Sequence, residues 1–356
     1  MMPRPILLLA LHASAQIALS PTSTTRVRVF GEDVIAYDAR DKIFADVMAH
    51  GAAWEPDTAA LLAALLAPGD GAIDVGAHVG TNALTMARAV GDAGVVVALE
   101  PQRAVHQLLC ASVALSGVSS SVVALWAAAG DGADAWFEAP VFTRAAWARN
   151  IMAVGIGAEG VIANGELGLR TLERVRALSV DAIVAAHLEG RCPRLIKIDV
   201  EGFERAVLAG ARDTLARCRP MLLVEVLCRR AVRRALSLLE PAGYACWWDP
   251  KPAFDNGTAG ASAVRAPLHW SMDMLCAPAE ARGGADARLA ALAPMTPLAP
   301  GQSSPNDRPD RRVRTRARLA EFMDVPNFDD PQCSGQIDTS IWDNEERAEP
   351  RAEPQS

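Results

Sequence analysis

The stretch GAIDVGAHVGTN at 71–82 constrains the fold more than any other part of the sequence. Ile73 and Val75 are typical of a short buried strand, and Asp74 lies near its carboxyl end. Gly76 and Gly80 follow where the chain must turn sharply and begin a helix, which glycine permits because it has no side chain. In an open α/β sheet, ligands bind just beyond such strand ends. The stretch therefore predicts a ligand site at the edge of a parallel sheet.

The composition is that of a globular protein with an ordinary core. The chain has 356 residues, of which 51% are hydrophobic and 22% charged. The net charge of −7 gives no reason to expect a nucleic acid partner, which favours a basic surface. No stretch reaches the ~18 apolar residues that a membrane span needs. The sequence carries no signal of oligomeric state.

The spacing around the glycine turn distinguishes two classes of cofactor. A dinucleotide fingerprint needs a glycine two positions after Gly76, but His78 stands there and blocks the close approach of a pyrophosphate. Asp74 would repel a pyrophosphate and attract a sulfonium or ammonium group. The next predicted strand ends at Glu100, whose carboxylate can accept hydrogen bonds from both ribose hydroxyls. This pattern favours S-adenosylmethionine, with a nicotinamide oxidoreductase as a disfavoured alternative.

Strands and helices alternate along the chain in the order expected for a doubly wound, mostly parallel α/β sheet. The predicted strands lie at 73–75, 95–100, 122–126, 195–202, 220–226, from 243 onward and at 269–277, and the predicted helices at 41–51, 58–66, 81–90, 105–116, 203–209 and 231–239. The last two strands form an antiparallel hairpin. Residues 138–170 show no clear period and are a candidate substrate loop.

Carboxylates gather at the ends of two predicted strands. Asp199 and Glu201 lie two apart and would point to one face if their strand continues, and Glu225 ends the next strand. Buried carboxylates are costly unless they serve a purpose, so we expect a general base here, Asp199 or Glu201 first, then Glu225 and His78. In an alternative interpretation, Asp199 only hydrogen-bonds the cofactor or helix amides. Two carboxylates can bind a divalent cation, but nothing in the spacing demands one, and we expect no metal.

The seven cysteines are scattered and include no C-x-x-C pair. Most of them lie in apolar segments, where a buried free thiol is the ordinary state. The sequence therefore predicts no disulfide framework.

Several motifs together resemble the FkbM family of S-adenosylmethionine-dependent methyltransferases. They are the segment 51–56, IDVGAHVGTNAL at 73–84, LEP at 99–101, LSVD at 178–181, LIKIDVEGFERAVLAGA at 195–211, Glu225 and Gly243-Tyr244. The resemblance covers about residues 41–278. His78 departs from it, because the family more often has asparagine there.

The resemblance implies a class I methyltransferase fold, which is a Rossmann-like, seven-stranded sheet with a terminal antiparallel hairpin. It also implies methyl transfer to a hydroxyl oxygen of a sugar or natural-product-like small molecule or glycan. The catalytic residues it implies are Asp199, Glu201 and Glu225. The cofactor-binding residues are Glu55, Asp74, Gly76, Ala77, His78, Gly80, Thr81, Asn82, Glu100 and Asp131. The alternative is a non-catalytic cofactor-binding or interaction module with the same fold.

The two ends differ from the predicted core at 71–278. Arg4, the apolar run 6–11 and Ala13-Ser14-Ala15 resemble a leader within residues 1–20. Entry into the secretory route or an organelle and a frayed N-terminus of a cytoplasmic protein both stay open. Residues 26–70 are expected to form a hairpin and helices over the crevice. Residues 279–356 are rich in proline and charge, which predicts a disordered tail.

Overall fold

The computed structural model describes residues 17–18, 24–41, 44–132, 136–141, 172–226, 229–252 and 270–279. The predicted leader, most of the 138–170 segment and the predicted tail lie outside the described residues. No helix within the described ranges is long and apolar enough to cross a membrane.

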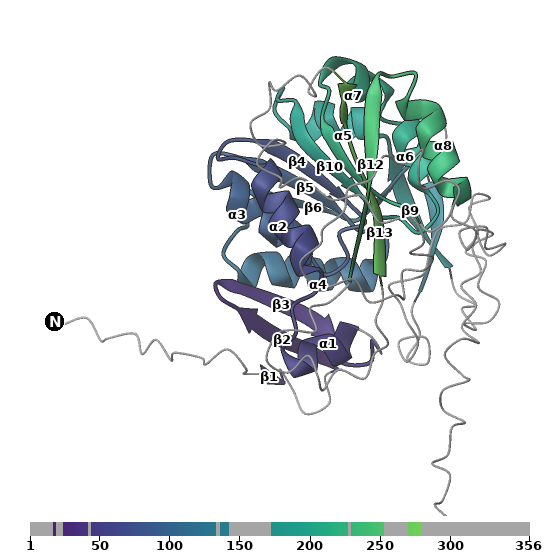
Figure 1. Ribbon diagram of the computed structural model, residues 1–356. Helices are drawn as coiled ribbons and strands as arrows, with labels where there is room; N and C mark the ends of the chain where they lie inside the picture. The colour runs from purple at the N-terminus through teal and green to yellow at the C-terminus, as the bar shows by residue number, and fades with distance from the viewer. Residues whose placement is uncertain are drawn as a thin grey trace, which may run out of the picture.

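A seven-stranded sheet forms the centre of the structure, in the order β12-β13-β11-β10-β4-β5-β6 (Figure 1). Its strands are β4 (Gly71–Val75), β5 (Val95–Leu99), β6 (Val122–Leu125), β10 (Pro193–Ile198), β11 (Met221–Glu225), β12 (Tyr244–Pro252) and β13 (Trp270–Pro278). β13 pairs antiparallel with both β11 and β12, and the other paired strands run parallel. The predicted doubly wound sheet with a terminal antiparallel hairpin is confirmed.

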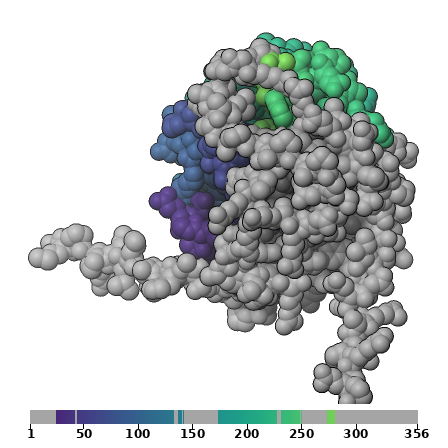
Figure 2. All heavy atoms as spheres, viewed as in Figure 1, coloured from purple at the N-terminus to yellow at the C-terminus, as the bar shows by residue number. Residues whose placement is uncertain are grey.

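Helices cover both faces of this sheet. One face carries α1 (Phe44–His50), α2 (Pro56–Leu65), α3 (Thr81–Val90) and α4 (Arg103–Leu115). The other carries α5 (Val180–His187), α6 (Glu204–Ala209), α7 (Arg212–Arg217) and α8 (Arg229–Leu239). Side chains alternate between these layers along β4: Ala72 packs into the first and Ile73 into the second. In Figure 2 the described N-terminal residues, purple and blue, lie on one side and the C-terminal ones, green, at the upper edge.

Two small sheets flank the centre. The first joins β1 (Ile17–Ala18), β2 (Thr25–Phe30) and β3 (Asp33–Asp38), and its last strand is tied to α4 because the hydroxyls of Ser112 and Ser116 accept hydrogen bonds from Ala36 and Val34. The second has the order β7-β9-β8, with β7 (Ala127–Ala129), β8 (Trp136–Pro140) and β9 (Leu172–Leu178). The sequence patterns did not predict this second sheet, and β8 takes the start of the segment in which no period was found.

Two disulfides join Cys192 to Cys218 and Cys246 to Cys276. The prediction of no disulfide framework is therefore wrong. The fold supplies the reason, because Cys246 and Cys276 lie directly opposite each other on β12 and β13. Cys192 and Cys218 come shortly before the neighbouring strands β10 and β11. Cys110 is free and exposed.

Candidate active site

Four acidic residues lie at or next to the carboxyl ends of four neighbouring parallel strands. Asp74 lies in β4, Glu225 ends β11, and Glu100 and Asp199 directly follow β5 and β10. Since these strands run in one direction, their carboxyl ends share one edge of the sheet. This edge is the candidate site.

The glycine turn after β4 is fixed by close backbone contacts. Gly76 has a φ of 83°, and a Cβ atom there would lie 1.8 Å from the carbonyl oxygen of Asp199. The backbone N–H groups of Gly76 and Ala77 both donate to the carbonyl of Leu99, at 3.0 and 2.8 Å. Only glycine fits this position, because a side chain would meet backbone and the left-handed φ would strain it. The turn is therefore held against the ends of both neighbouring strands.

Glu100 is buried and anchored through both carboxylate oxygens. Oε2 accepts from the backbone N–H of His78 at 3.1 Å, and Oε1 accepts from the backbone N–H of Gln102 at 2.8 Å. Burial raises the pKa of Glu100 to about 7, against the opposing effect of these two hydrogen bonds. Each oxygen keeps a further lone pair, so the carboxylate can still accept hydrogen bonds from the hydroxyl groups of a bound ribose.

Asp74 is fully buried, and neither of its carboxylate oxygens has a hydrogen-bond partner among the described residues. Burial raises its pKa to about 6, although the charge of Lys197 acts in the opposite direction. A buried carboxylate without a hydrogen bond is costly even with the ammonium group of Lys197 4.0 Å away, and a cationic ligand would relieve that cost. The residue therefore fits a ligand that carries an ammonium or sulfonium group.

The side chain of His78 faces the N-terminal elements. Its residue has a left-handed φ of 48°, its ring meets Phe44 edge-on at 5.2 Å, and Nε2 lies 4.0 Å from Oδ2 of Asp41. Burial lowers the pKa of His78 to about 4, so its ring is neutral at physiological pH. Its contact with Glu100 is made by the backbone N–H, which any residue type at this position could supply.

The remaining predicted cofactor residues divide into two groups. Gly80 caps α3, Thr81 and Asn82 begin it, and the amide of Asn82 donates to Oε2 of Glu55 at 3.4 Å. Glu55 is buried at the start of α2 with a left-handed φ of 43°. These residues thus meet at the start of α3, whereas Asp131 is exposed and follows β7 in the second small sheet.

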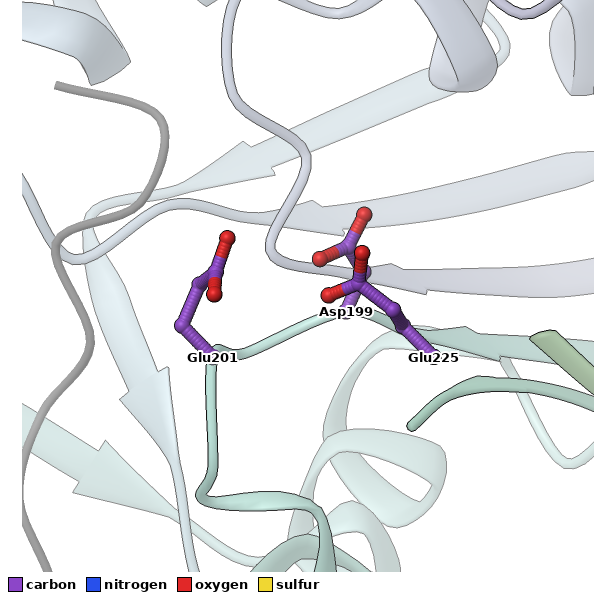
Figure 3. Close-up of side chains that lie close together, drawn as sticks. All are labelled: Asp199, Glu201 and Glu225. Carbon is purple, nitrogen blue, oxygen red and sulfur yellow. The ribbon is translucent and has the colours of Figure 1, made fainter. Parts of the chain in front are cut away.

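The predicted base candidates form a cluster. Carboxylate oxygens of Asp199, Glu201 and Glu225 all lie within 4.8 Å of one another, and Figure 3 shows the carboxylate of Asp199 beside that of Glu225. The expected continuation of the strand is wrong, because β10 ends at Ile198 and Glu201 takes a left-handed φ of 50°. The turn therefore brings Asp199 and Glu201 together, and a left-handed non-glycine residue is typical of functional sites.

The three carboxylates differ in acidity. Burial, followed by the negative charge of Asp199, raises the pKa of both Glu201 and Glu225 well above the usual value. Burial also acts to raise the pKa of Asp199, but the charge of Lys197 and the hydrogen bonds with Glu225 and Lys197 together lower it, and the net shift of the pKa is downward. Asp199 is thus the most acidic member of the cluster.

The spacing within this cluster would also allow a metal ion to be held, with one oxygen from each residue. All three side chains are partly exposed, and Asp199 already has a cationic partner in Lys197. The expectation of no metal stays a prediction.

Two buried residues at this edge were given no role from the sequence. Lys197 in β10 donates to Oδ2 of Asp199 at 2.8 Å, and Glu204 accepts from the backbone N–H of Gly202 at 2.7 Å. The signal for Lys197 was available, because a lysine in the otherwise apolar run LIKI must either reach the surface or find a buried anion.

A mostly parallel sheet in which β13 lies reversed between β11 and β12 has the strand order of the class I methyltransferase fold. Comparison with protein families gives a match of residues 74–245 to the methyltransferase FkbM domain. This match agrees with the motifs that resemble the FkbM family. No curated protein matches the chain.

The solved structures with a similar fold share little sequence with this chain. An S-adenosylmethionine-dependent O-methyltransferase from Thermotoga maritima is 13% identical, with 63% of this chain and 65% of that chain covered and a TM-score of 0.35. A methyltransferase FkbM from Methylobacillus flagellatus KT is 15% identical, with coverages of 58% and 43% and a TM-score of 0.34. An O-methyltransferase from Bacillus cereus is 13% identical, with coverages of 66% and 86% and a TM-score of 0.37. The fold assignment rests on the sheet order and the family match, and these likenesses add no argument to it.

Proposed function

We propose that this protein transfers the methyl group of S-adenosylmethionine to a hydroxyl oxygen of a small molecule, a sugar, a glycan or a natural-product-like scaffold. The observation that carries the proposal is the cluster of Asp199, Glu201 and Glu225 beside the strand ends that bear Asp74 and Glu100. The cofactor, when bound, supplies an electrophilic methyl group on a sulfonium.

The residues of the chain have separate tasks in this proposal. Asp74 and Glu100 bind the cationic and ribose parts of the cofactor. The acid cluster faces the acceptor, orients its hydroxyl group and takes its proton. In its ionised form, a carboxylate with a raised pKa is a stronger base than an ordinary one, which favours ionised Glu201 or Glu225 for proton removal and leaves orientation to Asp199. Orientation of this kind can supply about 7–11 kcal/mol of a barrier.

The test is methyl transfer by the purified full-length protein. The cofactor carries an isotopically labelled methyl group, the acceptors are monosaccharides, polyols and phenols, and amines and thiols of similar size serve as the comparison. We expect label only in hydroxyl acceptors and a loss of at least 100-fold in kcat in Glu201→Gln, in line with general-base catalysis. The matched control is Glu173→Gln, because Glu173 pairs with Arg103 away from the cluster.

The opposite results identify the alternatives. Label in amines or thiols would overturn O-methylation. Cofactor binding without transfer to any acceptor would favour the non-catalytic module, and binding of NAD in place of S-adenosylmethionine would favour the oxidoreductase.

We also propose that the protein enters an oxidising compartment. Two disulfides support this, since disulfides persist mainly in such compartments, and the leader-like segment 1–20 agrees with it. Fusion of residues 1–20 to a reporter protein, with localisation by microscopy, tests the proposal. A reporter that stays in the cytoplasm would contradict it.

A further inference from the structure

Lys197 is a buried cation in the centre of the sheet. Its side chain is 5% exposed, and its position on β10 pairs in register with Asp74 on β4 and Leu223 on β11. Removing an ammonium group from water is unfavourable unless nearby anions compensate for it. The contacts of Lys197 should therefore reveal why the position is not apolar.

The ammonium group reaches both parts of the candidate site. Nζ donates to Oδ2 of Asp199 at 2.8 Å and lies 4.0 Å from Oδ1 of Asp74. One cation thus lies between the carboxylate assigned to the cofactor and a carboxylate assigned to the acceptor.

This arrangement ties one member of the acid cluster to the central sheet. Asp199 accepts a charge-assisted hydrogen bond from Lys197, whose side chain is itself enclosed by the sheet. Replacing a whole buried ion pair by apolar residues is often neutral or stabilising, so stability alone does not explain why a lysine and two carboxylates are kept together here. A role in the reaction accounts for the lysine better than stability does.

We propose that Lys197 is a positioning residue for methyl transfer, which holds the Asp199 carboxylate towards the acceptor and allows it to lie close to Asp74. This inference rests on the proposed function. Lys197 contacts neither the acceptor nor the methyl group in this proposal, and acts through Asp199.

The first experiment compares single and double variants with an active acceptor. We expect Lys197→Met to lower kcat at least 30-fold with a change of less than threefold in the acceptor KM. We expect Asp199→Asn alone to lower kcat at least 30-fold. If Lys197 acts through Asp199, the double variant should have a kcat less than threefold below that of Lys197→Met. Lys197→Gln is the second variant should Lys197→Met not fold, and the same loss is expected because it also lacks the charge.

The second experiment tests the charge directly. Methylammonium added to Lys197→Ala should restore kcat at least tenfold, and sodium at equal ionic strength should not. Arg191→Met is the matched control, because Arg191 is a half-exposed cation that binds the carbonyl of Ala93 away from the acid cluster, and its kcat should stay within twofold of the wild type.

The outcomes separate the inference from the proposed function. If the wild type is active and Lys197→Met keeps its kcat within threefold of the wild type, the inference is overturned and the proposed function stands. Additive losses in the double variant have the same consequence. A wild type that transfers no methyl group to any acceptor overturns the proposed function, and the inference falls with it.

Discussion

The ammonium nitrogen of Lys197 lies 2.8 Å from Oδ2 of Asp199 and 4.0 Å from Oδ1 of Asp74, so two carboxylates on adjacent strands share one buried cation. This relationship joins the glycine turn after β4 to the acid cluster after β10. It also means that the charge of Asp199 is compensated by the chain itself.

Replacement of Glu100 by alanine should weaken S-adenosylmethionine binding ten- to a hundredfold, which is about 1.4–2.8 kcal/mol. The reason is the loss of the acceptor for the ribose hydroxyls, together with the anchor of the His78 and Gln102 N–H groups. Calorimetric titration measures it, with Glu173→Ala as the control. An unchanged affinity would remove the ribose assignment.

Stability and cofactor binding should depend on pH in opposite directions. Burial raises the pKa of Asp74 to about 6 and of Glu100 to about 7, so the folded chain binds these protons more tightly than the unfolded chain does. Their contribution to stability is fully present below roughly pH 4 and is lost as the pH rises through 6 and 7. A cationic cofactor prefers the ionised carboxylates, so its affinity should increase over the same range.

Urea unfolding of the cofactor-free protein and cofactor titration, both measured from pH 5 to 8, check this expectation. The variant Glu100→Gln should flatten both profiles. Cofactor affinity that is constant over this range would contradict the assignment of Asp74 and Glu100.

Gly76→Ala should be far more damaging than Gly91→Ala. Both glycines have a positive φ, which costs alanine about 1–3 kcal/mol, but a Cβ at Gly91 meets nothing within 4 Å. At Gly76 it would collide with the carbonyl of Asp199, so we expect a loss of more than about 4 kcal/mol of stability or of cofactor binding. Thermal unfolding of the two variants measures the difference, and equal losses would count against the close contact.

Reduction of the disulfides should lower the stability of the protein. The bridged cysteines are separated by 26 and 30 residues, for which each bridge is expected to contribute about 3–4 kcal/mol. Thermal unfolding with and without reductant measures the effect, and Cys110→Ser should leave it unchanged because that thiol is free. Seven reactive thiols in the denatured, unreduced protein would show that no bridge forms.

Methyl transfer should survive exhaustive chelation of divalent cations. Lys197 already compensates the charge of Asp199, so the acid cluster does not need a metal ion to hold it together. Turnover measured with and without EDTA checks this. Activity that disappears with EDTA and returns with magnesium would assign a metal to Asp199, Glu201 and Glu225.

Local patterns predicted most of the central fold. The helix predicted at 81–90 is α3 without a shift, and the strand predicted at 95–100 is β5 shortened by one residue, because glycines and apolar runs mark these boundaries. The sheet formed by β7, β8 and β9 was missed since Ala127–Ala129 is short, and it pairs with a strand more than 40 residues away. The partners of Lys197 and the cysteine pairs likewise depend on the register between distant strands, which one sequence does not reveal.

The contact between the Gly76 backbone and the Asp199 carbonyl has a consequence for how such a protein could acquire new acceptors. In the proposed function, this contact joins the turn that binds the cofactor to the residues that remove the proton, so a change in either part is expected to disturb the other. Substitutions that alter acceptor choice are therefore expected to accumulate in segments that border these two parts and leave them intact.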